Sequence, residues 1–170
     1  QRQMCIRDRY IKTLGWNTAI NRRQFAINVP HFEWPDDYRY PDILIEKKTS
    51  FKVGDTEILL NPARGETDDH LWAYIPKEKI LLSGDLFIWA VPNGGNPQKV
   101  QRYISDWADA LREMSELGAE IMLPGHGYPM FGKDNIKRAL ITTSVFLDDV
   151  EDQVLKLMNQ GKTLDFIIHN

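Results

Sequence analysis

The chain has 170 residues, of which 42% are hydrophobic and 26% charged, with a formal net charge of −3 at pH 7. This length and composition suit a globular protein with a single domain-sized core. The sequence carries no basic stripe and no apolar run of membrane-spanning length, so we expect neither a nucleic acid nor a membrane as a partner. The single cysteine, Cys5, excludes an internal disulfide and favours a cytoplasmic location.

The first nine residues are not expected to belong to the native fold. They show no periodicity, and residues 4–8, Met-Cys-Ile-Arg-Asp, look like the translated end of a sequencing transposon. We expect residues 1–9 to be an assembly scar, with a natural short leader as the alternative. Residues 10–25 then give a helical pattern of apolar side chains, and residues 29–41, with three prolines, predict an extended loop.

Short apolar runs separated by turn residues predict a largely antiparallel sheet in an α+β fold. Gly54 and Asp55 supply one of the turns. The expected strands are residues 43–45, 49–53, 57–60, 71–75, 79–82 and 119–123.

Helical periodicity predicts three helices in the second half of the chain. The first covers residues 100–114 and stops at Gly118, and the second covers residues 136–159 after a cap at Asp134 or Asn135. Thr163 caps a short helix over residues 164–168. We expect the long helix to bury an apolar face made of Ile136, Leu140, Phe146, Leu147, Val150, Val154, Leu157 and Met158.

Three potential metal ligands stand at predicted strand-to-loop junctions. Glu66 lies in the acidic stretch 64–70, Asp85 ends the run Leu-Leu-Ser-Gly-Asp, and His126 follows Leu-Pro-Gly. Carboxylate oxygen and imidazole nitrogen are common ligands of divalent metal ions. Each residue also has an ordinary interpretation, as a solvated turn, a strand exit or a structural histidine. Their order and context favour a metal site.

These motifs resemble the second half of a metallo-β-lactamase-fold hydrolase, and in particular its alkylsulfatase branch. Gly65-Glu66-Thr67 aligns with that fold's Gly-His-Thr turn, and the alkylsulfatase branch also has a glutamate nineteen residues before the bridging acid, which is the spacing of Glu66 and Asp85. Residues 124–132 are similar to that branch's His-x-aromatic-Pro-x-aromatic-Gly segment, and residues 152–161 look like the start of its dimerisation region. The resemblance implies a partial αββα sandwich over residues 10–135 and a dimerising helical region, hence a homodimer, over residues 136–170.

The resemblance also implies two divalent metal ions, usually zinc, that activate a shared hydroxide. Glu66 would bind the first ion, Asp85 would bridge the two, and His126 would bind the second. A carboxylate in place of imidazole would make the ions less Lewis-acidic and shift the preference toward manganese. The fold's His-x-His-x-Asp-His signature is absent from this sequence. We therefore expect a metal-dependent hydrolase of a small sulfate ester or related ester, of which these residues hold about half a site and are inactive alone.

Two residues near Glu66 are candidates for catalytic roles beside Asp85. If residues 66–70 are extended, Asp68 and His70 share one face with Glu66 and orient the metal ligands. A direct ligand role is the alternative for His70.

Trp89, Asn93 and Arg102, which all follow Asp85 in the sequence, are candidates for substrate contacts. Arg102 can pair with a sulfate through its planar guanidinium, although a solvated helix face is the favoured interpretation. Asn93 and Trp89 belong to a Gly/Pro/Asn loop of the kind that often contacts substrates, with a core position as the alternative for Trp89.

Two other functions stay open at this point. A lactonase or thioesterase can share the fold and the ligands, because a fold does not select a substrate. A non-catalytic module that dimerises through the helix over residues 136–159 would tolerate the loss of Glu66, Asp85 and His126.

Overall fold

The computed structural model describes residues 41–95 and 102–169. The chain divides into two units, Gln1–Asp42 and Ile43–Asn170, and the second is described here. The predicted helix over residues 10–25, all but the last residue of the predicted loop over residues 29–41, and the start of the predicted helix at residue 100 lie outside the described residues. The elements in order are β1 (Thr49–Val53), β2 (Thr56–Ala63), β3 (His70–Ile75), β4 (Ile80–Ile88), α2 (Ile104–Ser115), β5 (Ile121–His126), β6 (Met130–Phe131), α3 (Lys133–Asn159) and α4 (Leu164–His169).

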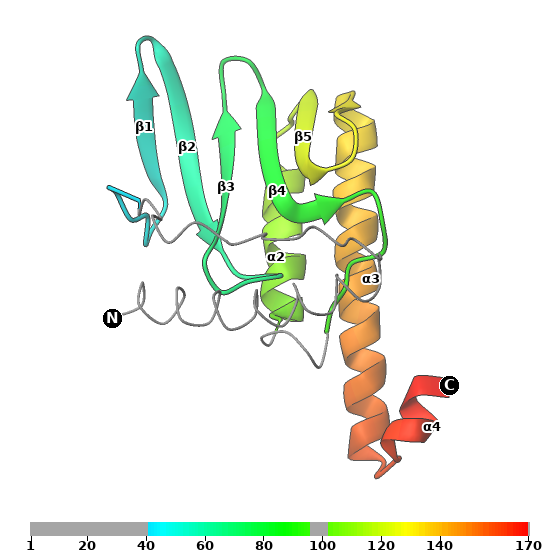
Figure 1. Ribbon diagram of the computed structural model, residues 1–170. Helices are drawn as coiled ribbons and strands as arrows, with labels where there is room; N and C mark the ends of the chain where they lie inside the picture. The colour runs from blue at the N-terminus through cyan, green and yellow to red at the C-terminus, as the bar shows by residue number, and fades with distance from the viewer. Residues whose placement is uncertain (1–40, 96–101, 170) are drawn as a thin grey trace, which may run out of the picture. The chain divides into compact units, whose positions relative to one another are not determined.

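The strands form one six-stranded sheet in the order β1-β2-β3-β4-β5-β6 (Figure 1). Every neighbouring pair is antiparallel except β4 and β5, which are parallel. The predicted α+β fold with a largely antiparallel sheet is therefore confirmed, as is the turn at Gly54, whose φ is 59°. The expected strand over residues 43–45 is wrong, because this exposed segment pairs with no described strand.

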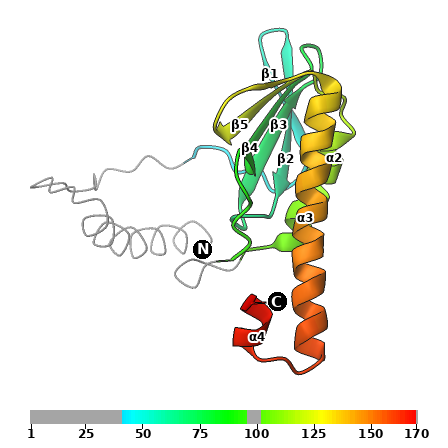
Figure 2. The ribbon, with the colours of Figure 1, turned by 90° about the vertical axis from the view of Figure 1, so that its right-hand side faces the viewer.

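Helices α2 and α3 cover one face of the sheet (Figures 1 and 2). Alternate residues of β3 and β4 point toward them, so Trp72 and Leu81 are buried while Leu71 and Leu82 are not. The indole nitrogen of Trp107 on α2 donates a hydrogen bond to the carbonyl oxygen of Leu86 at 2.7 Å. The core consists of Trp72, Tyr74, Leu81, Leu86, Phe87, Trp107, Ala108, Ala110, Leu111, Met114, Ala119, Met122, Met130, Ile136, Leu140 and Leu147.

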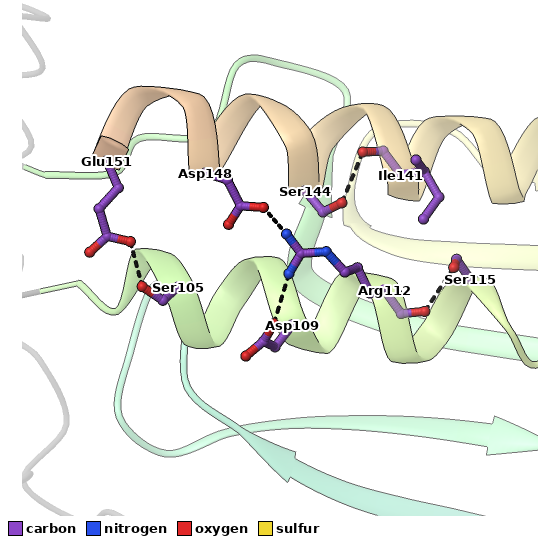
Figure 3. Close-up of polar contacts among 8 residues, drawn as sticks. All are labelled: Ser105, Asp109, Arg112, Ser115, Ile141, Ser144, Asp148 and Glu151. Atoms are coloured by element: carbon purple, nitrogen blue, oxygen red, sulfur yellow. Dashed lines mark hydrogen bonds and ion pairs between the residues drawn. The ribbon is translucent and has the colours of Figure 1, made fainter. Parts of the chain in front are cut away.

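Polar contacts join α2 and α3 at the rim of this core (Figure 3). Arg112 on α2 binds Asp109 on its own helix at 2.7 Å and Asp148 on α3. The hydroxyl of Ser105 donates to the carboxylate of Glu151. A residue early in α2, Ser105, contacts Glu151, whereas the later residue Arg112 contacts the earlier Asp148. The two helices therefore run antiparallel, and these contacts fix their register.

The opposite face of the sheet is also apolar. Register pairs place Leu60, Ala73, Leu82 and Leu123 in one row across four strands, and Ile75, Ile80, Ile121 and Phe131 in a second row. No described helix covers these rows, and Leu82 and Leu123 each stay 37% exposed. A sheet that is apolar on both faces is typical of the inner layers of a sandwich, which agrees with a partial αββα architecture.

Helix α3 begins earlier than the sequence predicts and continues past α2 (Figures 1 and 2). The predicted cap is wrong, because Gly132 precedes the helix and the Asn135 side chain instead donates to the carbonyl oxygen of Phe131 at 3.2 Å. Ile136, Leu140 and Leu147 are buried as expected. The expected burial is wrong for Phe146, Val150 and Met158, which are exposed.

The short helix α4 starts as predicted, since the Thr163 hydroxyl accepts a hydrogen bond from the Phe166 amide at 3.3 Å. A division of the chain at residue 135 stays a prediction, and α3 runs through that position. Among the described residues, no helix has the length and apolarity needed to cross a bilayer.

Candidate metal site

Asp85 and His126 meet where the parallel strands β4 and β5 reach the same edge of the sheet. His126 ends β5 and pairs with Ile88 in the ladder, and the register shifts between Gly84 and Ile88, so Asp85 lies in an irregular part of β4. The Nε2 atom of His126 is 3.5 Å from the Oδ1 atom of Asp85. This separation is longer than a normal hydrogen bond. Two ligands of one tetrahedral zinc ion, each about 2.1 Å from the metal, lie about 3.4 Å apart.

Glycines next to these residues leave the space that the carboxylate occupies. A Cβ atom on Gly125 would overlap the Oδ1 atom of Asp85 and would lie 2.9 Å from the carbonyl carbon of Gly84. Contacts as short as these with backbone atoms cannot be relieved by a side-chain rotation. The glycine before His126 is therefore required for the close approach of β5 to Asp85.

Glu66 lies in a turn between β2 and β3 that is fastened to the start of α2. The amide of Tyr103 donates to the carbonyl oxygen of Gly65 at 3.0 Å. Arg64 binds Asp106 at 2.7 Å and covers the ring of Tyr103. Gly65 packs directly on the core, since a Cβ atom there would be 3.0 Å from the Cγ atom of Trp107.

Arg102 forms an ion pair with Glu66, with 2.6 Å between its Nη2 atom and the Oε1 atom of Glu66. The Arg102 side chain is only 2% exposed, so the expected solvated helix face is wrong. Arg102 also precedes the first residue of α2. Its Nε atom is buried with no hydrogen-bond partner. The guanidinium therefore depends on the carboxylate of Glu66 for its countercharge.

His70 lies between the acidic turn and Asp85. Its Nε2 atom would be 2.8 Å from a Cβ atom on Gly84, the residue before Asp85. Burial lowers the pKa of His70, and the opposing effects are a hydrogen bond with the Ser83 backbone and the negative charges of Asp85, Glu66 and Asp69. With its pKa lowered by burial, His70 favours the neutral imidazole, and the charges of both predicted carboxylate ligands act on it.

Asp68 does not follow the predicted alternation. Residues 65–69 form bends and a turn, and β3 starts only at His70, so the condition that residues 66–70 are extended is not met. Asp68 is exposed. The charge of Asp69, to which the sequence analysis assigns no role, also acts on His70, although less than those of Asp85 and Glu66.

The loop after β4 carries the two other predicted substrate residues. The side-chain oxygen of Asn93 accepts a hydrogen bond from the Gly95 amide at 3.2 Å and so shapes its own loop. Trp89 is exposed, which excludes the core position, and its indole nitrogen donates to the carbonyl oxygen of Tyr128 at 2.6 Å.

Comparison with known proteins agrees with this geometry. The family model described as the metallo-beta-lactamase superfamily matches residues 10–126. The chain belongs to this superfamily. The alkylsulfatase-like resemblance seen in the sequence is also confirmed, because alkylsulfatases are among its similar relatives and solved structures.

Three superfamily members illustrate the similarity. The linear primary-alkylsulfatase of Pseudomonas sp. (strain ATCC 19151) is 26% identical over 105 residues, which is 61% of this chain and 20% of that protein. The metallo-beta-lactamase type 2 of Elizabethkingia meningoseptica is 25% identical over 137 residues, 75% of this chain and 47% of that protein. The structure of the stereoselective inverting sec-alkylsulfatase Pisa1 from Pseudomonas sp. has a TM-score of 0.67 and 26% identity, covering 74% of this chain and 21% of that one. The chain thus spans about a fifth to a half of the length of these superfamily members.

Superfamily membership implies divalent metal ions, and the described residues fit such an ion at one place. Asp85 and His126 offer an oxygen and a nitrogen at the spacing of two ligands of one ion, and Gly125 keeps room for the carboxylate. Glu66 is held by Arg102 instead. Within residues 41–95 and 102–169, no group of three or more His, Cys, Asp or Glu side chains is arranged to hold a metal. The structure therefore brings two of the three predicted ligands together.

The ion pair of Glu66 and Arg102 gives a first testable prediction. Replacing Glu66→Gln keeps the shape but removes the countercharge of a buried guanidinium that cannot lose its proton. We expect the free energy of unfolding to fall by about 3 kcal/mol. Adding Arg102→Met to this variant should recover part of the loss, because no buried charge then remains. Urea unfolding of the two single variants and the double variant measures the coupling.

The chain offers a matched control in the ion pair of Lys79 and Glu120, which has the same 2.6 Å separation but is half exposed. Replacing Glu120→Gln should change the free energy of unfolding by less than about 1 kcal/mol. Equal losses for Glu66→Gln and Glu120→Gln would contradict the assignment of a buried, structurally required pair.

Proposed function

We propose that this chain contributes to the active site of a metal-dependent hydrolase, with Asp85 and His126 as ligands of a divalent ion. The 3.5 Å separation of their ligand atoms carries the proposal, because it is too long for a hydrogen bond and suits a shared ion. Membership of the metallo-beta-lactamase superfamily supports it. Zinc suits the mixed oxygen and nitrogen ligands, and manganese is the alternative.

The other residues of the site would prepare Asp85 and Glu66 for this role. Arg102 binds the Oε1 atom of Glu66, and the carboxylate of Glu66 is the candidate ligand of a further ion. His70 stays neutral because burial lowers its pKa, so its imidazole can exchange hydrogen bonds with a ligand without adding charge. A bound divalent ion supplies a water-derived nucleophile at neutral pH.

A sulfate ester on an apolar group is the proposed substrate. The names of two similar proteins, a linear primary-alkylsulfatase and a sec-alkylsulfatase, support this class. The exposed side chains of Trp89 and Asn93, on the loop that follows Asp85, are the proposed contacts for the substrate. A contact with Arg102 would require its guanidinium to leave Glu66.

Metal binding by the chain itself is the first test of the ligand assignment. We expect Mn²⁺ to bind weakly, since two or three protein ligands leave a coordination shell incomplete. The paramagnetic ion should broaden the NMR signals of Asp85 and His126 first. Replacing Asp85→Asn or His126→Gln should remove this selective broadening.

A second histidine–aspartate pair in the same chain serves as the control. The Nε2 atom of His169 is 3.6 Å from the Oδ1 atom of Asp165, but this pair lies on the exposed surface of α4. If Mn²⁺ broadened the signals of both pairs at the same concentration, the binding would be that of any exposed pair and the proposed site would fail.

Activity of the natural gene product tests the reaction. We expect it to release sulfate from dodecyl sulfate only when metal is present. Replacing Asp85→Asn should lower kcat/KM more than a substitution of a residue that only orients a metal ligand. Such substitutions typically cost roughly 10–100-fold. Faster turnover of an acyl thioester or a lactone than of dodecyl sulfate would replace the sulfatase assignment with the alternative within the superfamily.

We also propose that the chain forms a homodimer through α3 and α4. Support comes from the exposed apolar side chains Val150, Leu155, Met158, Leu164 and Ile168, which lie on the second half of α3 and on α4. Large exposed apolar patches commonly mark protein–protein interfaces. The same surface supports the non-catalytic dimerisation module as a second candidate function.

Substitutions on α3 test the dimer. Replacing Leu155→Lys together with Met158→Lys should raise the dimer dissociation constant at least about tenfold, because both would place a charge in an apolar interface. Sedimentation equilibrium measures the change. As a control, Val145→Lys changes an exposed position in the first half of the same helix and should leave the dimer dissociation constant unaltered. A monomer at every concentration of the unmodified chain would contradict the proposal.

A further inference from the structure

Trp89 contacts both residues that follow His126. Its indole nitrogen donates to the carbonyl oxygen of Tyr128 at 2.6 Å. Its ring also packs on Gly127, where an added Cβ atom would overlap the Cδ1 atom of Trp89 and lie 2.9 Å from its Cγ atom. The φ of Gly127 is 96°, a conformation that side chains other than glycine rarely adopt. The loop after His126 is thus shaped to receive this indole.

The indole is itself fixed to the strand that carries Asp85. Trp89 stands edge-to-face on Phe87, with ring centroids 6.1 Å apart and an interplanar angle of 77°. Phe87 is buried in the core. This contact ties the indole of Trp89 to a core residue of β4.

Backbone pairing alone leaves the approach of His126 to Asp85 loosely determined. The ladder between β4 and β5 is irregular from Gly84 to Ile88, the stretch that contains Asp85. The His126 side chain is 76% exposed, so little packing holds it. The hydrogen bond and the ring contact from Trp89 to the residues just after His126 restrain the loop at the point where the ladder ends.

We infer that Trp89 is a positioning residue that holds the His126 loop against Asp85. In this role the indole N–H binds a backbone carbonyl oxygen, so the proposed substrate contact of Trp89 is left to its ring. The consequence for metal affinity rests on the proposed ligand role of His126, whereas the effect on the loop does not. Preorganised ligands bind more tightly because less conformational freedom is lost when the metal arrives.

Two substitutions of Trp89 separate the parts of the contact. Trp89→Phe keeps a ring against Gly127 but removes the hydrogen bond to Tyr128, and Trp89→Leu removes both. Tyr128→Ala is the matched control, because its ring is 82% exposed and only its backbone carbonyl oxygen takes part. Trp89 is also exposed, so these variants should keep the unfolding midpoint in urea unchanged.

The expected readout is local. Backbone NMR order parameters of Gly127 and Tyr128 should fall from about 0.85 to below about 0.6 in Trp89→Leu, with an intermediate change in Trp89→Phe and none in Tyr128→Ala. The affinity for Mn²⁺ should fall about 10–100-fold in Trp89→Leu. It should fall less in Trp89→Phe and stay unchanged in Tyr128→Ala. A residue with a purely structural role would move the unfolding midpoint instead.

Two outcomes would overturn the inference. One is a rigid loop in both Trp89 variants, and the other is an equal loss of order in Tyr128→Ala. If the unmodified chain bound no Mn²⁺ while the loop loosened as expected, the positioning role would stand and the proposed metal site would fail.

Discussion

The parallel pairing of β4 with β5 is the constraint on which the candidate site depends. Parallel neighbours need a crossover, and α2 supplies it between the two strands. The carboxyl ends of both strands then reach the same edge of the sheet, which brings Asp85 and His126 together although they are far apart in sequence. The packing of α2 on the sheet, with Trp107 bound to the carbonyl oxygen of Leu86, fixes the relation of the strands. The packing of the core therefore also positions the residues of the candidate site.

Glycines set how closely the parts of this site approach. Gly65 lets the turn of Glu66 rest on Leu86 and Trp107, Gly125 admits the carboxylate of Asp85, and Gly127 admits an indole. In each case the space of a Cβ atom is filled by a side chain from another element. The motif Pro-Gly-His-Gly is thus explained by contacts on both sides of the histidine, one with β4 itself and one with the loop after β4.

The elements that the sequence predicted well are those with a strong local signal. His126 ends β5 after a short apolar run, as the sequence predicts, whereas the strand-to-loop junction expected at Asp85 is wrong, because β4 continues to Ile88. The turn at Gly54 and the cap at Thr163 are likewise local. The interpretation of the chain as part of an αββα sandwich combined these signals with motif order.

The errors concern contacts that local patterns do not encode. Arg102 was assigned to a solvated helix face, but its burial depends on Glu66, a partner in a distant turn. The strand expected at residues 43–45 has suitable residues but finds no described neighbour. The apolar periodicity of α3 was read as a buried face, although the last buried side chain of this helix is Leu147. Periodicity predicts which side of a helix is apolar and does not predict how much of that side is covered.

The ion pair of Glu66 and Arg102 changes the electrostatic expectation for the site. Glutamate in place of histidine was expected to add negative charge and so to weaken the Lewis acidity of bound metal ions. With the guanidinium 2.6 Å away, the pair carries no net charge, as a neutral imidazole carries none. A guanidinium keeps its proton in proteins, so Arg102 supplies this compensation for as long as it binds Glu66. What would distinguish Glu66 from a histidine ligand is then the hardness of its oxygen and not its charge, which favours manganese through ligand type alone.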